Sequence, residues 1–262
     1  MSPPMTIRDQ ALLGQAGAGG CGIEDTDLKT YWKFNEASGD IINNSEASAD
    51  LGSGADLQVT GADYQTGSPP LGQSMNFEGT DSAENYALAG SSLSQFNFMH
   101  NSTAKWTTAW WSKATTRDTT FTYFATDRST SKNGVSIHGN TNASMSMLMY
   151  NGGTPYPIQS QSGANFIPDT TTWHFYVMTY DYSLGSDNLV MKRDNANAYT
   201  DDNDAGSHSD GNAGYVMRIG RKPDYTEDYL DGEINESSIW DKVMSDEDQT
   251  SLYNGGSGLA IY

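Results

Sequence analysis

The chain has 262 residues, of which 36% are hydrophobic, and it contains 27 Gly and 8 Pro. A chain of this length and composition can bury one sizeable core, so we expect one β-rich domain preceded by a short arm. Its 14 basic and 33 acidic residues give a formal net charge of -19, which repels phosphate backbones and anionic membranes. We therefore expect no nucleic-acid partner. Such a surface is typical of simple solubility or of a saline or calcium-containing environment.

The single cysteine, Cys21, has no partner for an internal disulfide, so packing alone must stabilise the fold. No stretch approaches the roughly 18 apolar residues of a membrane span. The N-terminal residues also lack the basic start and apolar core of a secretory signal. We expect a protein that stays inside the cell, leaves it by lysis or a non-standard route, or has lost a leader.

Residues 1–26 are predicted to form an arm outside the main domain, which we place at 27–262. A turn of helix is expected near its start, followed by a flexible Gly/Ala-rich link at residues 14–22. The apolar residues of the arm are Pro3, Pro4, Ile7, Leu12 and Leu13. Two interpretations are open: a disordered tail, or an arm that becomes ordered by docking on a neighbouring subunit of an assembly.

The rest of the chain alternates β-type runs with polar turn clusters, which is typical of an antiparallel sandwich or jelly roll. The longest runs, Lys105–Lys113 and Thr172–Tyr182, are rich in aromatic residues and Thr, which favour strands. The other expected strands are 28–35, 56–60, 75–77, 83–89, 120–126, 134–138, 145–150, 188–193, 215–220 and 230–240. Strands 75–77 and 83–89 are predicted to pair with each other around the turn between them.

One helix is predicted, near the C-terminus. Ser245 stands at the N-cap position, acidic residues fill the first turn, and Gly255 follows the end. Two turns bury too little surface to be stable alone, so the helix must pack against a larger β-structure. In the preceding strand, alternation with period two places Ile234, Glu236 and Trp240 on one buried face.

Five stretches share the pattern of one family. They are Trp32–Glu36 with Ser38 and Gly39, Met75–Gly79, Thr172–Asp181, Ile219–Arg221, and Gly232–Glu236 with Ile239, Trp240, Leu252 and Tyr253. Together they resemble the LamG-like jelly rolls of the concanavalin A-like lectin/glucanase superfamily. This resemblance covers residues 28–256 and implies an all-β, two-sheet antiparallel jelly-roll sandwich with one short C-terminal helix. Asp194 and Asn195 stand at the family's Asp-Gly hairpin turn.

The same superfamily includes β-glucanases, whose catalytic strand places carboxylates at alternate positions. Retaining hydrolysis requires two carboxyls about 5 to 5.5 Å apart. Counting from Glu233, the alternate positions hold Asn235 and Ser237, and Asp231 with Glu233 lacks the third carboxylate. We therefore expect no catalytic residues and no enzymatic activity. His174 is expected to be a hydrogen-bonded member of its strand rather than a base or a metal ligand.

Two places could supply oxygen ligands to calcium. The first is the acidic run with Asp201, Asp202 and Asp204, for which a solvated loop is the alternative. The second combines Glu36 or Asp40 with Glu236, because a charge on a buried face must be paired or metal-bound. Pairing of Glu236 with Arg218 or Arg221 is the alternative explanation.

Sugar binding requires aromatic platforms and polar groups on an exposed face or loop rim. The alternative for any aromatic residue is a place in the core. The candidates, expected in loops that flank the middle strands, are Tyr123, Asp127, Arg128, His138, Asn140, Tyr150 and Tyr156.

Three functions remain. We favour a non-catalytic structural, decoration or adhesion protein, displayed on an assembly whose subunits hold the arm, because compact LamG-like chains resemble virion surface proteins of marine phages. Such a protein would lie on a virion surface or outside the cell, with glycan binding as an added role. The second function is a secreted or surface lectin. A glycan hydrolase or lyase is the third, and Asn235 and Ser237 disfavour it.

Overall fold

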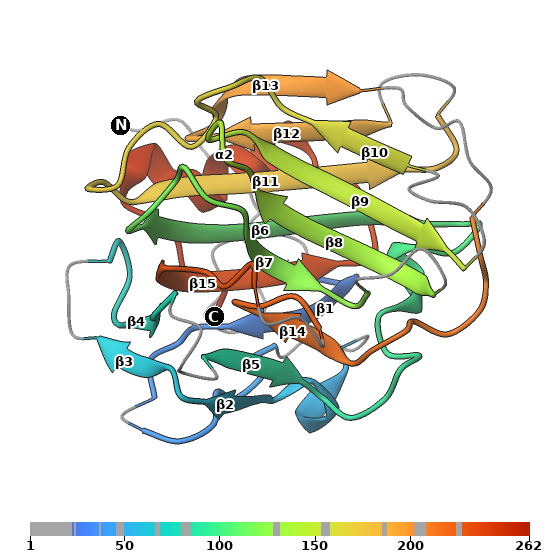
Figure 1. Ribbon diagram of the computed structural model, residues 1–262, viewed down its shortest axis with the longest axis horizontal. Coiled ribbons are helices and arrows are strands. Elements are labelled where there is room, and N and C mark those ends of the chain that lie inside the picture. Colours follow the sequence, from blue (N-terminus) through green and yellow to red (C-terminus); the bar gives the residue numbers. More distant parts are fainter. Residues whose placement is uncertain are drawn as a thin grey trace, which may run out of the picture.

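The computed structural model describes residue 23 and residues 25–36, 38–45, 50–65, 69–79, 85–127, 132–152, 158–184, 188–201, 208–223 and 227–262. Within these residues the chain forms two antiparallel sheets, one eight-stranded and one seven-stranded, with one short α-helix near the C-terminus (Figure 1). The predicted all-β sandwich is confirmed. The predicted arm lies almost entirely outside the described residues.

Each sheet mixes strands from distant parts of the sequence. The eight-stranded sheet has the order β13 (Ala196–Asp201), β12 (Leu189–Arg193), β11 (His174–Asp181), β6 (Lys105–Ala114), β15 (Gly232–Trp240), β4 (Ser74–Phe77) and β3 (Asp63–Gln65), with β1 (Leu28–Trp32) paired to β15. The seven-stranded sheet has the order β10 (Ile158–Gln161), β9 (Met145–Asn151), β8 (Asn133–Gly139), β7 (Phe121–Ala125), β14 (Met217–Ile219), β5 (Tyr86–Ala89) and β2 (Leu57–Thr60). Short 3-10 helices lie at Gly52–Ala55, Asn97–Met99 and Asn254–Gly256.

The main core fills the space between the two sheets and is rich in aromatic rings. Trp110 of β6 lies 5.6 Å from the ring of Tyr176 and 5.2 Å from that of Tyr123, measured between centroids. Two buried indoles also donate to backbone oxygens, from Trp32 to Ala55 at 2.8 Å and from Trp106 to Met99 at 2.9 Å. The long aromatic strands predicted from the sequence therefore supply the centre of the fold.

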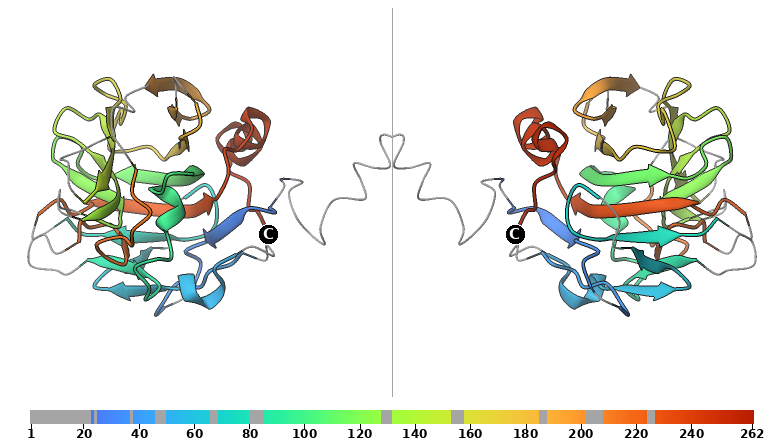
Figure 2. Two further views of the ribbon diagram at one scale, coloured as in Figure 1. Left: turned by 90° about the vertical axis from the view of Figure 1, so that its right-hand side faces the viewer. Right: turned by 90° about the vertical axis from the view of Figure 1, so that its left-hand side faces the viewer.

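A second apolar layer lies on the outer side of the eight-stranded sheet, where helix α2 (Asp246–Tyr253) and the C-terminal segment pack (Figure 2). Trp111 of β6 stacks on Tyr253 with centroids 5.9 Å apart and an interplanar angle of 18°. The helix begins as predicted, because the Ser245 hydroxyl accepts a hydrogen bond from the Asp248 amide. It ends at Asn254, whose left-handed backbone forms the C-cap.

A β-bulge in β15 changes the predicted faces of that strand. Ile234 enters the core between the sheets, whereas Trp240 belongs to the outer apolar layer. The ladder between β15 and β6 shifts between Asn235 and Ser238, and Glu236 has a φ of 47°. One extra residue reverses the alternation of every residue after it. The predicted common face of Ile234, Glu236 and Trp240 is therefore wrong.

The predicted pairing of residues 75–77 with 83–89 is also wrong. β4 pairs with β15 and β3, while β5 pairs with β14 and β2, so the two strands lie in different sheets. The hairpin turn between β12 and β13 is confirmed, because Asp194 and Asn195 both have positive φ, at 52° and 56°. No helix among the described residues is long and apolar enough to cross a membrane.

Candidate functional site

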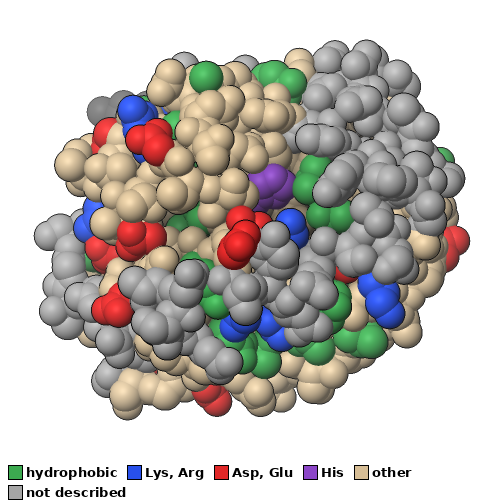
Figure 3. All heavy atoms as spheres, viewed as in Figure 1, with side chains coloured by type: hydrophobic (Ala, Val, Ile, Leu, Met, Phe, Trp, Pro, Cys, Tyr) green, Lys and Arg blue, Asp and Glu red, His purple; other side chains and the backbone are tan. Residues whose placement is uncertain are grey.

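The face of the seven-stranded sheet that turns away from the core carries polar side chains. In β8, Val135 and Ile137 enter the core, so Ser136 and His138 point the opposite way. Thr122 of β7 and Ser146 of β9 alternate with core residues in the same manner. We call this surface the polar face. Figure 3 shows a histidine near the centre of the view, above an acidic and a basic side chain, with further basic side chains lower on the same face.

One row of the polar face runs across four neighbouring strands. Thr122 lies opposite His138, His138 opposite Ser146, and Ser146 opposite Gln161. Asn140 joins the row from the loop after β8, since its amide donates to the Ser146 hydroxyl at 2.8 Å. The structure thus brings two predicted residues, His138 and Asn140, to one end of the polar face.

His138 is a buried member of this row with an unsatisfied ring nitrogen. Its side chain is 9% exposed, and Nδ1 has no hydrogen-bond partner among the described residues. Thr122 Oγ1 and Ser136 Oγ are also buried and lack such a partner. Burial, and secondly the charge of Lys222, lower the pKa of His138 to about 4, so the imidazole is neutral at pH 7. Its ring nitrogens can therefore exchange hydrogen bonds with a ligand.

Three cations lie in and directly after β14, and we call Arg218, Arg221 and Lys222 the basic cluster. The guanidinium carbon of Arg218 lies 5.0 Å from the ring centroid of Tyr86. That of Arg221 lies 5.4 Å from Tyr86 and 5.0 Å from Tyr229. The two arginines and two rings thus form a cation–π ladder. The predicted alternative that either arginine pairs with Glu236 is wrong, since Glu236 lies on the outer side of the other sheet.

The chain that carries the basic cluster is bonded back to β7. The Thr122 amide donates to the Asp228 backbone oxygen at 3.0 Å, and the Leu230 amide donates to that of Gly220 at 2.8 Å. Lys222 Nζ lies 3.7 Å from the Asp228 carboxylate. Because Asp228 adjoins Thr122, and Thr122 lies opposite His138, Lys222 lies beside the polar row.

The remaining predicted glycan residues lie elsewhere. Tyr123 is fully buried in the core, and Tyr150 lies in β9 with 1% exposure, so the expected loop positions are wrong. Neither ring presents a face to a sugar. Asp127 is buried after β7, near the far end of β8. Arg128 and Tyr156 lie outside the described residues. Reasoning from the sequence missed the basic cluster, although three cations within five residues are conspicuous in so acidic a chain.

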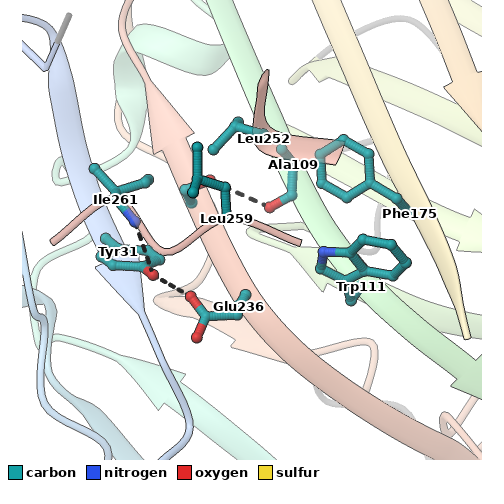
Figure 4. A pocket seen from close by; sticks show the side chains of 9 residues that line it. Tyr31, Ala109, Trp111, Phe175, Glu236, Leu252, Leu259 and Ile261 are labelled. Carbon is teal, nitrogen blue, oxygen red and sulfur yellow. Dashed lines mark hydrogen bonds between the residues drawn. The ribbon is translucent and has the colours of Figure 1, made fainter. Parts of the chain in front are cut away.

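Glu236 lies in a small pocket between β1, β15 and the C-terminal segment (Figure 4). The Tyr31 hydroxyl donates to its carboxylate and accepts a hydrogen bond from the Ile261 amide at 3.2 Å. Burial raises the pKa of Glu236 to about 8, against the opposing effects of Tyr31 and Lys33. The carboxyl is therefore largely protonated at pH 7. Since the pocket is small and its carboxyl is already bonded to Tyr31, we interpret this group as part of the packing.

The predicted calcium residues do not assemble into a cage within the described part of the chain. Glu36 accepts a hydrogen bond from the Ile42 amide at 2.8 Å, and Asp40 accepts one from the Val59 amide at 3.1 Å. No group of three or more His, Cys, Asp or Glu suited to a metal occurs there, so Glu236 does not join them. In the acidic run, Asp201 ends β13, and Asp202 and Asp204 lie outside the described residues.

The positions of β15 that a glucanase would use make structural contacts. Glu233 Oε1 lies 2.5 Å from Lys113 Nζ. The Asn235 amide donates to the backbone oxygens of Leu71 and Gln73, at 2.6 and 2.5 Å. An aspartate cannot donate these two bonds, which explains the amide at this position.

His174 is held between two carboxylates on the eight-stranded sheet. Its Nδ1 lies 2.7 Å from Asp194 and its Nε2 lies 3.1 Å from Asp169. Burial opposes protonation, but these contacts outweigh it and raise the pKa of His174. This clasp connects the loop before β11 to the β12–β13 turn, so His174 is a hydrogen-bonded member of its strand as predicted.

Residues 81–248 match the Laminin_G_3 family model, described as the concanavalin A-like lectin/glucanases superfamily. The chain belongs to this family. The comparison with curated proteins gave no match. Among solved structures, the chain is similar to the botulinum neurotoxin serotype D binding domain, with a TM-score of 0.58, 12% identity, and coverage of 89% of this chain and 52% of that one.

Two further structures show the same fold. The binding domain of Paraclostridial Mosquitocidal Protein 1 has a TM-score of 0.62 and 11% identity over 88% of this chain and 52% of its own. Trypanosoma rangeli sialidase in complex with the inhibitor DANA has a TM-score of 0.57 and 12% identity over 86% and 32%. The chain spans about half the length of the two binding domains. At these identities the likeness concerns the fold.

Proposed function

We propose that this protein is a non-catalytic adhesion protein that binds a glycan on the polar face. The observation that carries the proposal is His138, a neutral, almost fully buried imidazole with an unpartnered nitrogen among other polar side chains. Buried polar groups are normally hydrogen-bonded, so a row of them beside unsatisfied atoms favours a ligand that completes the bonds. The resemblance in fold to two solved binding domains supports a binding role.

The chemistry of the polar row suits sugar hydroxyls. A hydroxyl both donates and accepts, and so do the side chains of Thr122, Ser146, Asn140 and Gln161. His138 adds a nitrogen that accepts and another that donates. A saccharide lying across the row could therefore make several hydrogen bonds at once, which gives orientation and specificity.

We propose that the protein has no hydrolytic activity. The support comes from β15, where Glu233 is bonded to Lys113 and Asn235 donates to two backbone oxygens. No reducing sugar should be released from β-glucans, and release that Glu233→Gln abolishes would contradict this part of the proposal.

A broad glycan array, probed with and without calcium, tests the binding function. We expect a hit that His138→Leu weakens about tenfold, because charge-free hydrogen bonds in a buried site contribute on the order of 1 kcal/mol each. His174→Leu is the matched control, since it removes a histidine from the clasp on the other sheet and should bind normally. A blank array, or equal loss in both variants while both stay folded, contradicts the proposal.

We also propose that the protein is displayed on a larger assembly, and we favour a virus particle. The support is the apolar content of the predicted arm, Pro3, Pro4, Ile7, Leu12 and Leu13, in an otherwise acidic chain. Sedimentation of the full chain and of residues 27–262, alone and with particles from the source, tests this role. Unchanged incorporation without the arm would contradict it and leave a secreted or surface lectin as the function.

A further inference from the structure

We infer that residues 257–262, which we call the strap, form a pH-dependent cover of the outer apolar layer. The neutral carboxyl of Glu236 keeps the strap closed, and ionisation of this carboxyl releases it. The inference concerns the outer face of the eight-stranded sheet and is independent of the proposed glycan binding.

The strap packs on the eight-stranded sheet without joining a strand. The Gly258 amide donates to the Tyr253 backbone oxygen at 3.2 Å, and Lys33 Nζ donates to the Tyr262 backbone oxygen at 2.9 Å. Gly258 also passes close to the sheet, since a Cβ at this position would lie 3.3 Å from the indole Nε1 of Trp111. The strap can therefore lift without breaking a sheet ladder, unlike the strands below it.

Tyr31 of β1 connects the strap to Glu236 (Figure 4). Its hydroxyl accepts a hydrogen bond from the Ile261 amide at 3.2 Å and donates one to the Glu236 carboxyl. The Tyr31 ring also lies 6.2 Å from the ring of Tyr262, measured between centroids. Ile261 is 3% exposed and belongs to the outer apolar layer. One hydroxyl thus contacts both the strap and the buried acid.

The backbone of β15 places Glu236 under the strap. Its φ of 47° at the bulge turns the side chain toward the outer face, where Leu259 and Ile261 line the same pocket. A buried charge is normally paired, but Glu236 forms no ion pair among the described residues. An ionised carboxylate here needs water, and the strap is the part of the pocket wall that no ladder holds in place.

Few other groups near this pocket can titrate. Within the described residues, β1 contributes Tyr31 and Lys33, and helix α2 contributes Tyr253. The Tyr262 hydroxyl donates to the Asp25 carboxylate at 2.5 Å. The residues that line the pocket from β6 and β11 do not ionise; they are Ala109, Trp111 and Phe175. Glu236 is the only carboxylic acid among the described lining residues.

The direction of the pH effect follows from burial of Glu236. Burial raises its pKa from 4.5 to about 8, against smaller opposing effects of Tyr31 and Lys33. The closed strap therefore retains a proton that the open strap, with the carboxyl in water, releases. Closure is most favourable below pH 4.5, and its equilibrium constant falls about tenfold for each pH unit between 4.5 and about 8.

Hydrogen exchange of the full chain, corrected for the intrinsic rate at each pH, tests the inference. The protection of the Ile261 amide should fall about tenfold per pH unit between 4.5 and about 8. The reference is the Met178 amide of β11, a strand that pairs on both sides. Low urea should accelerate exchange at Met178 and hardly change it at Ile261, because opening of the strap exposes little surface.

Glu236→Gln keeps the shape of the side chain and cannot ionise. Its Ile261 protection should match the wild type in acid and exceed it by about a hundredfold or more at pH 8. The matched control is Glu233→Gln, which neutralises a carboxyl of the same strand that is paired with Lys113, and it should follow the wild type.

Equal pH dependence in the wild type and in Glu236→Gln would overturn the inference, because another group would then release the strap. A flat pH profile of Ile261 in the unaltered protein would overturn it as well, whether or not any variant folds. So would an equal urea response of Ile261 and Met178, because the strap would then open only with the whole fold.

Discussion

The two outer faces of the sandwich differ in the side chains that they carry. Each belongs to a sheet whose inner face fills the core, so each must be covered or exposed to water. On the eight-stranded sheet, Trp111, Phe175 and Trp240 meet helix α2 and the C-terminal segment in an apolar layer. On the seven-stranded sheet, the outer positions hold the polar Ser136 and His138 beside Leu148 and Tyr150 of β9.

The difference shows which outer face is covered by apolar packing and which one carries buried polar atoms without partners among the described residues. Apolar surface withdrawn from water stabilises the fold, whereas a buried polar atom without a partner costs free energy. Thr122, Ser136 and His138 keep the second arrangement, so the chain gives up stability at these positions. Proteins keep buried polar atoms without partners mostly at functional sites. Substitutions on the outer face of the eight-stranded sheet should therefore change stability, and those on the polar face should change glycan binding.

Trp111→Ala should have the largest effect on stability. Trp111 is 2% exposed, contacts Phe175 and stacks on Tyr253, so its loss removes the surface on which helix α2 packs. We expect the free energy of unfolding, measured with urea, to fall by about 3–5 kcal/mol. The matched control is Trp173→Ala, whose half-buried ring contacts Lys113 and should cost much less. Equal losses would show that the apolar layer is not what secures this face.

Asn235→Asp should come next, although it restores the residue that the family pattern favours. Two backbone oxygens, those of Leu71 and Gln73, would then face a buried carboxylate in place of an amide donor. We expect a loss of about 3 kcal/mol at pH 7, smaller at acidic pH where the new carboxyl is protonated. The measurement is urea unfolding at both pH values. Unchanged stability, or hydrolysis of a β-glucan, would contradict the structural role of Asn235.

Glu236→Gln tests the carboxyl in the small pocket beside the apolar layer. Its pKa is raised from 4.5 to about 8, so the folded chain holds the proton more tightly than the unfolded chain does. The contribution to stability is complete below 4.5 and is lost as pH rises toward about 8. The variant stays neutral, so we expect it to exceed the wild type by roughly 2 kcal/mol at about pH 9 and to match it in acid. Parallel curves across this range would contradict the raised pKa.

The sequence predicted the fold where local signals and tertiary packing agree. Period-two runs with Trp, Tyr and Thr marked β6 and β11, and the Ser245 cap marked helix α2. It could not predict the bulge at Glu236, because the left-handed backbone of a non-glycine residue is set by pairing with β6 and β1. β3 and β10 were missed because short polar runs become strands only through their neighbours.

The site was predicted only in part, for a similar reason. His138 and Asn140 were chosen as polar groups for sugar hydroxyls near the middle strands, and the structure brings them together. Tyr123 and Tyr150 show that aromatic content does not distinguish a loop rim from a buried position. The cation–π ladder of the basic cluster forms only when β14 lies between β5 and β7, which places Arg218 near Tyr86. That neighbourhood is a property of strand order, which short-range patterns do not contain.

His138→Leu should have the smallest effect on stability at pH 7. We expect a gain, whereas Trp111→Ala and Asn235→Asp should each cause a loss. Leu fills most of the same space and removes a buried nitrogen that has no partner, so we expect a gain of up to about 1 kcal/mol at pH 7. The wild type should also lose stability as pH falls from 6.5 toward about 4, because the unfolded chain takes up the proton that the folded chain refuses. The variant should lack this dependence.

His174→Leu should instead lower the stability, most of all below the raised pKa of His174, while retaining glycan binding. Urea unfolding across this pH range and glycan titration are measured for both variants. We expect His138→Leu to weaken binding without loss of stability, and His174→Leu to lower stability without loss of binding. Loss of stability in His138→Leu with binding intact would place His138 with the fold and contradict the assignment of the two faces.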